Sequence, residues 1–245
     1  GSTRAGIAVT RDAAETVKRV TLELGGKSPN LVFADCDLEA RVAASVRECM
    51  FNTGQSCDAP TRLLVERSCY GEALRIAKQT AVSITVGDPT QEGDHIGPLF
   101  DKIQYDRVQA MIKVGLAEGA TLLAGGPGRP EGLAKGWFVK PTIFADVSND
   151  MRIAQEEIFG PVLVIIPFAD EAEGIAIAND TPYGLAAYVQ TGDPERALRV
   201  AARLRAGAIH INGGGFNYGS PFGGYKQSGN GREGGIMGLE DYLET

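Results

Sequence analysis

The sequence is organised around one stretch, Phe51-Asn52-Thr53-Gly54-Gln55-Ser56-Cys57-Asp58-Ala59-Pro60-Thr61-Arg62. Apolar residues at helical spacing predict a helix over 38–50 that runs into this stretch, with Asp37 as its N-cap. A short apolar strand, Leu63 to Val65, runs out of it. Cys57 therefore lies on a loop held by two regular elements, which is how a nucleophile is presented. The alternative is a small buried apolar residue, the commoner role of an intracellular cysteine, and the thiol alone favours that alternative.

The twelve residues together favour catalysis, because they resemble the active-site cysteine motif of the aldehyde dehydrogenase superfamily. In that motif Phe, Asn, Gly, Gln, Cys and Arg recur at this spacing. Two further signatures follow the family order: 22–29, LELGGKSP, resembles the general-base segment, and 156–161, EEIFGP, resembles the segment that touches the nicotinamide riboside. The resemblance runs from Gly1 to Thr245 and covers only the C-terminal, catalytic half of a family member.

The resemblance implies two catalytic residues. Cys57 would attack an aldehyde as thiolate, the reactive form of cysteine, with its backbone N–H as one oxyanion donor. Glu23 would activate the water that hydrolyses the resulting thioester, and its presence favours hydrolysis over transfer of the acyl group to coenzyme A. Glu23 ends a predicted strand, so partial burial should raise its pKa. The alternative for Glu23 is an ordinary solvated strand-end carboxylate.

The resemblance also implies a cofactor site for NAD or NADP. Glu157 would accept hydrogen bonds from ribose hydroxyls, and Phe159 would pack near the nicotinamide. The start of a predicted helix at Ser2 would meet the dinucleotide, because helix N-termini attract phosphate. Each segment also has an ordinary structural interpretation, as a helix-to-strand turn and as a capped helix. The remaining residues that the resemblance implies at this site are Gly1, Gly6, Leu24 and Gly25.

Composition excludes several functional classes. The 245 residues carry a formal charge of −7 with both signs interspersed, so no basic patch points to nucleic acid. No stretch is long and apolar enough to span a membrane. The four cysteines form no C-x-x-C pair, and only two histidines are present, so a metal site is not indicated. Reduced thiols and a cytoplasmic location are the simplest interpretation.

The alternation of strand and helix patterns from 30 to 211 predicts an α/β fold: a parallel sheet with helices on both faces, in three layers. We expect a remnant of a dinucleotide-binding domain at 1–25, a catalytic domain at 26–212, and a Gly-rich segment at 213–245 that returns toward the cofactor domain. Strands are predicted at 19–24, 31–33, 63–66, 121–123, 137–144, 162–168, 185–190 and 208–211. Helices are predicted at 3–14, 38–50, 69–82, 101–118, 171–179 and 194–204.

The resulting prediction is an NAD(P)-dependent aldehyde dehydrogenase that releases a carboxylic acid and forms a homo-oligomer when complete. We expect the present chain to be inactive alone, because it lacks most of a dinucleotide site and the family's second oxyanion donor. Two rival functions stay open. One is a cofactor-free thiol hydrolase that uses Cys57, with His210 as its only plausible partner. The other is a binding or scaffold protein that keeps the fold without the chemistry.

Overall fold

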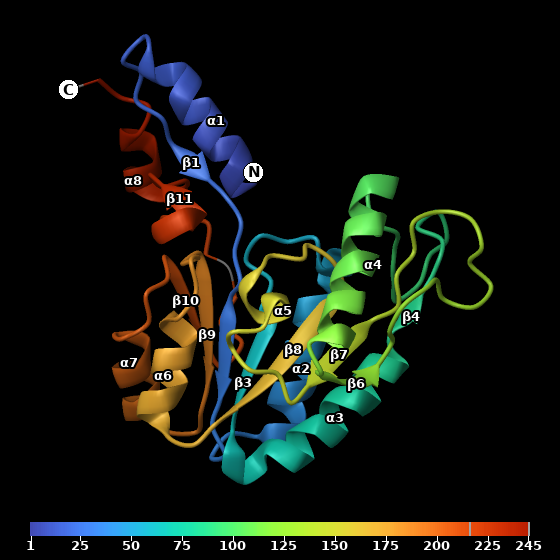
Figure 1. The fold of residues 1–245 in the computed structure, drawn as a ribbon. Helices are drawn as coiled ribbons and strands as arrows, with labels where there is room; N and C mark the ends of the chain where they lie inside the picture. Colours follow the sequence, from blue (N-terminus) through green and yellow to red (C-terminus); the bar gives the residue numbers. More distant parts are fainter. Residues whose placement is uncertain (216, 245) are drawn as a thin grey trace.

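A seven-stranded sheet forms the centre of the molecule (Figure 1). The computed structural model describes residues 1–215 and 217–244, so residues 216 and 245 of the predicted 213–245 segment lie outside the described residues. The strand order is β10-β9-β2-β3-β8-β7-β6. The strands are β2 (Pro29–Val32), β3 (Arg62–Glu66), β6 (Thr121–Ala124), β7 (Thr142–Ala145), β8 (Val162–Phe168), β9 (Ala186–Gln190) and β10 (Ala208–Ile211).

The sheet is parallel, as predicted, except at one edge. Five neighbouring pairs, from β10–β9 to β8–β7, are parallel, whereas β6 pairs with β7 antiparallel. No helix lies between β6 and β7. A parallel neighbour needs a crossover connection, whereas an antiparallel one needs only a returning loop. The Gly- and Pro-rich loop at 125–141 supplies that return.

Helices cover both faces of the sheet, as predicted (Figure 1). Neighbouring strand residues such as Leu31 and Val32 point to opposite faces, and each face has its own apolar core. One core packs against α2 (Leu38–Met50) and α3 (Tyr70–Ser83). The other packs against α4 (Lys102–Ala117), α5 (Arg152–Gln155), α6 (Glu171–Asn179) and α7 (Pro194–Ala201).

Three predicted segments differ from the observed elements. The strand predicted at 137–144 forms ladder hydrogen bonds with its neighbours only from Thr142 onward, because Pro141 has no N–H to donate. The strand predicted at 19–24 is reduced to β1 (Leu22–Glu23). In α4, which was predicted at 101–118, Met111 and Ile112 are buried, whereas Leu116 is 41% exposed and does not join the buried apolar face.

A small unit lies beyond one end of the sheet and carries both chain ends (Figure 1). It contains α1 (Thr3–Ala14), β1, β11 (Gly229–Asn230) and α8 (Gly235–Glu240). β1 and β11 pair antiparallel, with Glu23 opposite Gly229. The Gly-rich segment reaches this ribbon through the turn η3 (Lys226–Ser228). A separate pair, β4 (Thr85–Val86) and β5 (His95–Ile96), lies near the end of α2 and its following turn η1 (Phe51–Gly54).

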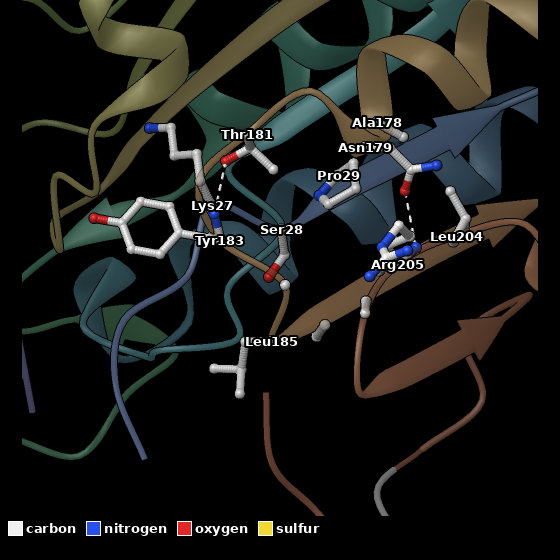
Figure 2. Close-up of a pocket in the computed structure, with 14 residues that line it drawn as sticks. Lys27, Ser28, Pro29, Ala178, Asn179, Thr181, Tyr183, Leu185, Leu204 and Arg205 are labelled. Carbon is white, nitrogen blue, oxygen red and sulfur yellow. Dashed lines mark hydrogen bonds between the residues drawn. The ribbon is translucent and has the colours of Figure 1, made fainter. Parts of the chain in front are cut away.

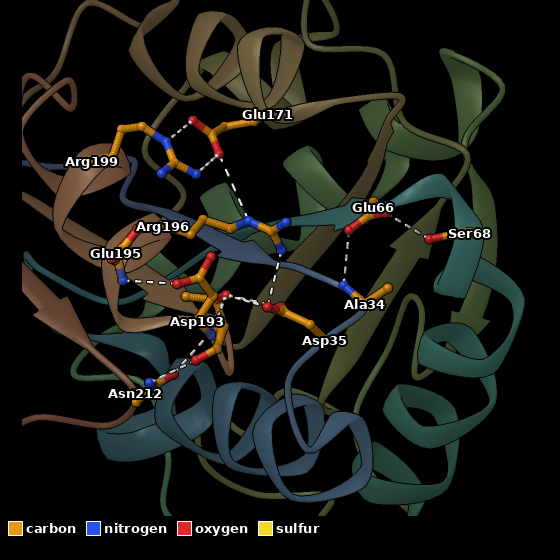
Figure 3. Close-up of polar contacts among 11 residues, drawn as sticks. Ala34, Asp35, Glu66, Ser68, Glu171, Asp193, Glu195, Arg196, Arg199 and Asn212 are labelled. Atoms are coloured by element: carbon orange, nitrogen blue, oxygen red, sulfur yellow. Dashed lines mark hydrogen bonds and ion pairs between the residues drawn. The ribbon is translucent and has the colours of Figure 1, made fainter.

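In this chain, paired polar side chains occupy the position where open α/β sheets commonly bind ligands. Such sites lie at the carboxyl ends of the strands, where consecutive connections leave in opposite directions, here between β2 and β9. Thr191 Oγ1 donates to both carboxylate oxygens of Asp35 at 2.9 Å. Arg196 pairs with Asp35 at 3.1 Å (Figure 3). Arg196 and Arg199 also pair with Glu171. The loop that carries Cys57, the cysteine loop, lies at the opposite, amino-terminal end of β2 and β3.

Candidate active site

The cysteine loop is built by a sharp change of backbone direction after α2. Asn52 and Thr53 adopt φ of 49° and 59°, and Gly54 has φ of 68°. A Cβ at Gly54 would overlap the backbone carbonyl of Gly160. The loop therefore packs directly on the turn that follows Glu157 and Phe159, which brings two of the three predicted motifs together.

Cys57 is half-buried in this loop. Burial, the largest cause, and the nearby carboxylates of Glu23 and Asp58 together raise the pKa of Cys57 to about 12, while the backbone N–H groups of Asp58 and Cys57 act to lower it. This shift favours the protonated thiol, because a desolvated thiol between two carboxylates holds its proton. That Cys57 attacks as thiolate stays a prediction. A base must remove that proton before attack.

Glu23 supplies a carboxylate at the required place. Its pKa is raised, chiefly by burial and also by the charge of Glu233, while hydrogen bonding by the Cys57 side chain lowers it. One carboxylate oxygen, Oε1, is buried without a hydrogen-bond partner among the described residues. The predicted partial desolvation of Glu23 is thus present. An oxygen of this kind is available to accept a proton from a thiol or from water.

The peptide between Gly25 and Gly26 joins the base segment to the other two motifs. Gly26 N–H donates to Glu157 Oε1 at 3.2 Å. A Cβ at Gly25 would overlap the Glu157 carboxylate, and one at Gly26 would overlap the Cys57 carbonyl. Only glycine permits both approaches. Burial raises the pKa of Glu157, and the Gly26 hydrogen bond opposes that shift.

Helix α4 fixes the backbone of the Glu157–Phe159 segment. The buried Gln104 amide donates to the carbonyls of Ile158 at 2.8 Å and Phe159 at 2.7 Å. Arg107 donates to the carbonyl of Glu157 at 2.7 Å. These bonds stabilise the positive φ of 56° at Phe159. Glu156, by contrast, points to solvent and pairs with Arg152.

The start of α1 lies against the same centre. Ser2 caps the helix by accepting the Ala5 N–H at 3.3 Å, as predicted. The Gly1 amine donates to the Glu23 carbonyl at 2.7 Å. Gly6 is buried and packs on Leu24, which is itself 6% exposed. The structure thus gathers these predicted cofactor residues around the backbone of Glu23.

Neither histidine is placed as a partner for Cys57. The His210 ring stacks on Tyr188 at 4.9 Å between centroids, and its Nδ1 lies 2.9 Å from the Gly214 carbonyl. Tyr188 in turn donates to the Asp58 carbonyl at 3.1 Å, beneath the loop. His95 Nε2 lies 3.0 Å from the Asp88 carbonyl. The geometry does not support a Cys57–His210 dyad.

Two cations of the motif segments are buried beside the site, which the sequence patterns did not predict. Arg62 is fully buried and donates to three backbone carbonyls and to Asn149, at 2.8–3.0 Å. Lys27 is 1% exposed, and its amine has no hydrogen-bond partner among the described residues. Burial lowers the pKa of Lys27 to about 7. Figure 2 shows its side chain extending away from Ser28 and the small cavity of about 10 Å³ that they line.

The family comparison agrees with this geometry. The profile of the aldehyde dehydrogenase family matches residues 1–245. The chain belongs to this family. One aldehyde dehydrogenase relative, the 3-succinoylsemialdehyde-pyridine dehydrogenase of a Pseudomonas species, is 55% identical over 244 residues, which are 100% of this chain and 51% of that protein. The chain spans about half the length of the curated relatives it matches.

Solved aldehyde dehydrogenases share the fold of this chain. A cysteine-to-alanine mutant of aldehyde dehydrogenase C from Pseudomonas syringae, in complex with NAD+ and octanal, aligns with a TM-score of 0.98 at 52% identity. The alignment covers 100% of this chain and 50% of that one. The NAD+ complex of the Bacillus cereus enzyme aligns at 0.96 with 45% identity, over 100% of this chain and 49% of that one.

Other kinds of site are not found in the part of the chain that the structure describes. Over 1–215 and 217–244, no cluster of three or more His, Cys, Asp or Glu side chains is arranged to hold a metal ion. Within the same ranges, no helix is long and apolar enough to cross a membrane.

Proposed function

We propose that a protein combining this chain with the half that its relatives also contain oxidises aldehydes to carboxylic acids with NAD+ or NADP+. The observation that carries the proposal is the convergence of three segments. Glu23 faces Cys57, and the Gly25–Gly26 peptide beside them is held by Glu157. A nucleophile, a base and a candidate cofactor carboxylate thus meet at one point.

The chain's own residues account for the proton and acyl chemistry. Glu23 accepts the thiol proton as the Cys57 sulfur bonds to the aldehyde carbon, giving a thiohemiacetal whose oxyanion is stabilised by the Cys57 N–H. Loss of hydride from that carbon leaves a thioester on Cys57. Glu23 releases this first proton to solvent and then takes a proton from water, which attacks the thioester carbon. The C–S bond breaks, the Cys57 sulfur takes back a proton from Glu23, and the acid leaves.

The residues present fit one end of a dinucleotide. The Glu157 carboxylate is held by one backbone N–H, and its second oxygen, which has no hydrogen-bond partner among the described residues, would accept from a ribose hydroxyl. Phe159 is half-buried beside it. A bound nicotinamide supplies the hydride acceptor. Gly1, Ser2, Gly6, Leu24 and Gly25 would border the rest of the ligand. Because so few contacts remain, this chain alone should bind dinucleotide weakly and show no steady turnover.

Two rival functions predict different behaviour. A cofactor-free thiol hydrolase would have to use Glu23 as the base for Cys57, because His210 is engaged elsewhere, and it would leave Glu157 and Phe159 without a cofactor to contact. A scaffold would have no reason to retain a buried unpaired carboxylate oxygen beside a cysteine, since such a group costs stability. Both rivals are less well supported than aldehyde oxidation.

Assembly, location and domain limits complete the proposal. β10 lies at the sheet edge, and its outer side has no strand partner among the described residues, so strand addition from a second copy would support a homo-oligomer. Light scattering that shows only monomer would contradict this.

All four cysteines are free, which supports a cytoplasmic location. The domain limits at 25/26 and 212/213 place the cofactor-side pieces at the two chain ends.

An aldehyde panel with both cofactors tests the proposal. The panel should include octanal, which is bound in the P. syringae relative, and polar aldehydes, because Asp58 borders Cys57. We expect aldehyde-dependent reduction of NAD+ or NADP+ by the complete protein, and none by Cys57→Ala. Ester hydrolysis without any cofactor reduction would favour the thiol hydrolase, and neither activity would favour the scaffold.

A further inference from the structure

The buried Ser228 lies where three distant segments meet. Its side chain is 0% exposed. Its hydroxyl donates to the Gly25 carbonyl at 2.6 Å and accepts the Gly184 N–H at 2.9 Å. Its own carbonyl accepts the Leu24 N–H at 3.0 Å. Ser228, from the Gly-rich segment, therefore binds the backbone N–H of Leu24, the residue that follows Glu23, and the carbonyl of the next residue, Gly25.

The Ser228 hydroxyl and the Glu157 carboxylate hold the same peptide group from opposite ends. The carbonyl of Gly25 and the N–H of Gly26 belong to one planar unit. Ser228 binds the carbonyl, and Glu157 Oε1 binds the N–H at 3.2 Å. Rotation of this plane would break both bonds together. The orientation of the peptide after Glu23 thus depends on Ser228 and Glu157 jointly.

Ser228 is itself anchored to the catalytic sheet. The turn before it docks on the segment that leads into β9, through Tyr225 N–H to Gly184 O at 2.9 Å and Gln227 N–H to Pro182 O at 3.0 Å. The Lys226 amine adds bonds to the carbonyls of Asn179 at 2.7 Å and Thr181 at 3.0 Å. The position of Ser228 is therefore set by the same sheet that carries the cysteine loop.

We propose that Ser228 is a positioning residue that holds Glu23 against Cys57 and Glu157 toward the cofactor, through the Gly25–Gly26 peptide. The inference deepens the proposed function and rests on it. Its geometric part is the packing of the segment after Glu23 on the cysteine loop, where a Cβ at Gly26 would overlap the Cys57 carbonyl. This part has a readout that needs no turnover. A carboxylate facing a thiol raises the thiol pKa, so moving it away speeds alkylation of that thiol at a fixed pH.

The test is a double-mutant cycle on Cys57 alkylation in the complete protein. Iodoacetamide rates at pH 8 are measured by mass mapping for wild type, Ser228→Ala, Glu23→Gln and the double variant, with Cys69 as the internal reference. We expect Ser228→Ala to speed Cys57 alkylation at least threefold. The double variant should be no faster than Glu23→Gln, because both changes act through one group. Additive rates would overturn the proposal, since they would mean a generally loosened loop.

Two variants separate positioning from general stability. Asn230→Ala removes the bond from Leu22 N–H to Asn230 Oδ1, at 3.1 Å, in the same β1–β11 ribbon but leaves the Gly25–Gly26 peptide untouched. Thr80→Val removes a buried hydroxyl bond in α3, far from the site. Both should leave the alkylation rate within twofold of wild type. If Ser228→Ala does not fold, Ser228→Cys provides a second test, because it keeps the side-chain volume and a weak donor. It should speed Cys57 alkylation in the same direction but by a smaller factor.

A kinetic measurement links the geometry to the reaction. Ser228→Ala should lower steady-state kcat at least tenfold and raise the KM for the cofactor, while Asn230→Ala changes neither. Unchanged kcat in a folded Ser228→Ala protein that turns over through Cys57 would overturn the inference and leave the proposed function intact. No turnover in wild type would remove the proposed function, and the alkylation cycle would still decide whether Ser228 positions Glu23.

Discussion

The carboxylate of Glu23 and the thiol of Cys57 are close enough to shift each other's pKa, in opposite directions. Glu23 raises the pKa of Cys57, after burial, and the Cys57 side chain lowers that of Glu23 against the larger effect of burial. In the proposed reaction, the thiol proton moves from sulfur to the Glu23 carboxylate when an aldehyde is bound. A raised pKa keeps Cys57 in the less reactive thiol form, which is also less easily oxidised.

Replacing Glu23 by glutamine should make Cys57 more reactive toward alkylation at neutral pH. The change removes a negative charge that raises the thiol pKa, so the pKa falls and the thiolate fraction at pH 8 rises. We expect alkylation to be about three- to tenfold faster, since one pKa unit is a factor of ten. Cys69 in the same sample is the control and should not change. An unaltered Cys57 rate would show that Glu23 does not face the thiol.

Gly54→Ala should disable the site while a matched glycine change does not. A Cβ at Gly54 would overlap the Gly160 carbonyl, and the backbone there has φ of 68°. The cysteine loop must then shift from the Glu157–Phe159 turn, and a shift of about 1 Å costs about 10²-fold in rate. Gly71, in α3, has open space around it, so Gly71→Ala should keep full activity. Near-normal turnover in Gly54→Ala would contradict the packing described above.

Removing the buried guanidinium of Arg62 should destabilise the whole chain. Arg62→Met leaves the carbonyls of Lys27, Ile177 and Ala178 without their donors. Buried acceptors that lose their partners cost about 1–3 kcal/mol each, so we expect a loss of about 3 kcal/mol or more in the free energy of unfolding by urea. Arg75→Met, on the exposed surface of α3, is the control and should have a much smaller effect. Equal losses would remove the special role of Arg62.

Local patterns predicted most elements but not the edge of the sheet. The ranges of β8, α6 and β10 agree with prediction because each is a continuous apolar run or a capped helix. The direction of β6 depends on its connection to β7, which no local pattern records. The strand predicted at 137–144 was too long because buried residues before Pro141 pack without laddering.

The site was predictable only where one short motif carries the chemistry. Cys57, Glu23 and Glu157 stand in recognisable segments, and the structure brings these segments together. Ser228 was missed because its partner Gly25 lies 203 residues away along the chain. Gln104 was missed because a helix glutamine binding two carbonyls of a turn leaves no periodic signal. The raised pKa of Cys57 was missed because it depends on burial and on two carboxylates from different segments.

Rapid-mixing measurement of the first turnover tests the central claim most directly. The complete protein and its Glu23→Gln and Cys57→Ala variants are mixed with saturating aldehyde and cofactor, and reduced cofactor is followed by absorbance. We predict that Glu23→Gln forms one equivalent of reduced cofactor per active site, more slowly than wild type, and then stops at the thioester, while Cys57→Ala forms none. Continued turnover by Glu23→Gln at the wild-type rate would contradict the account.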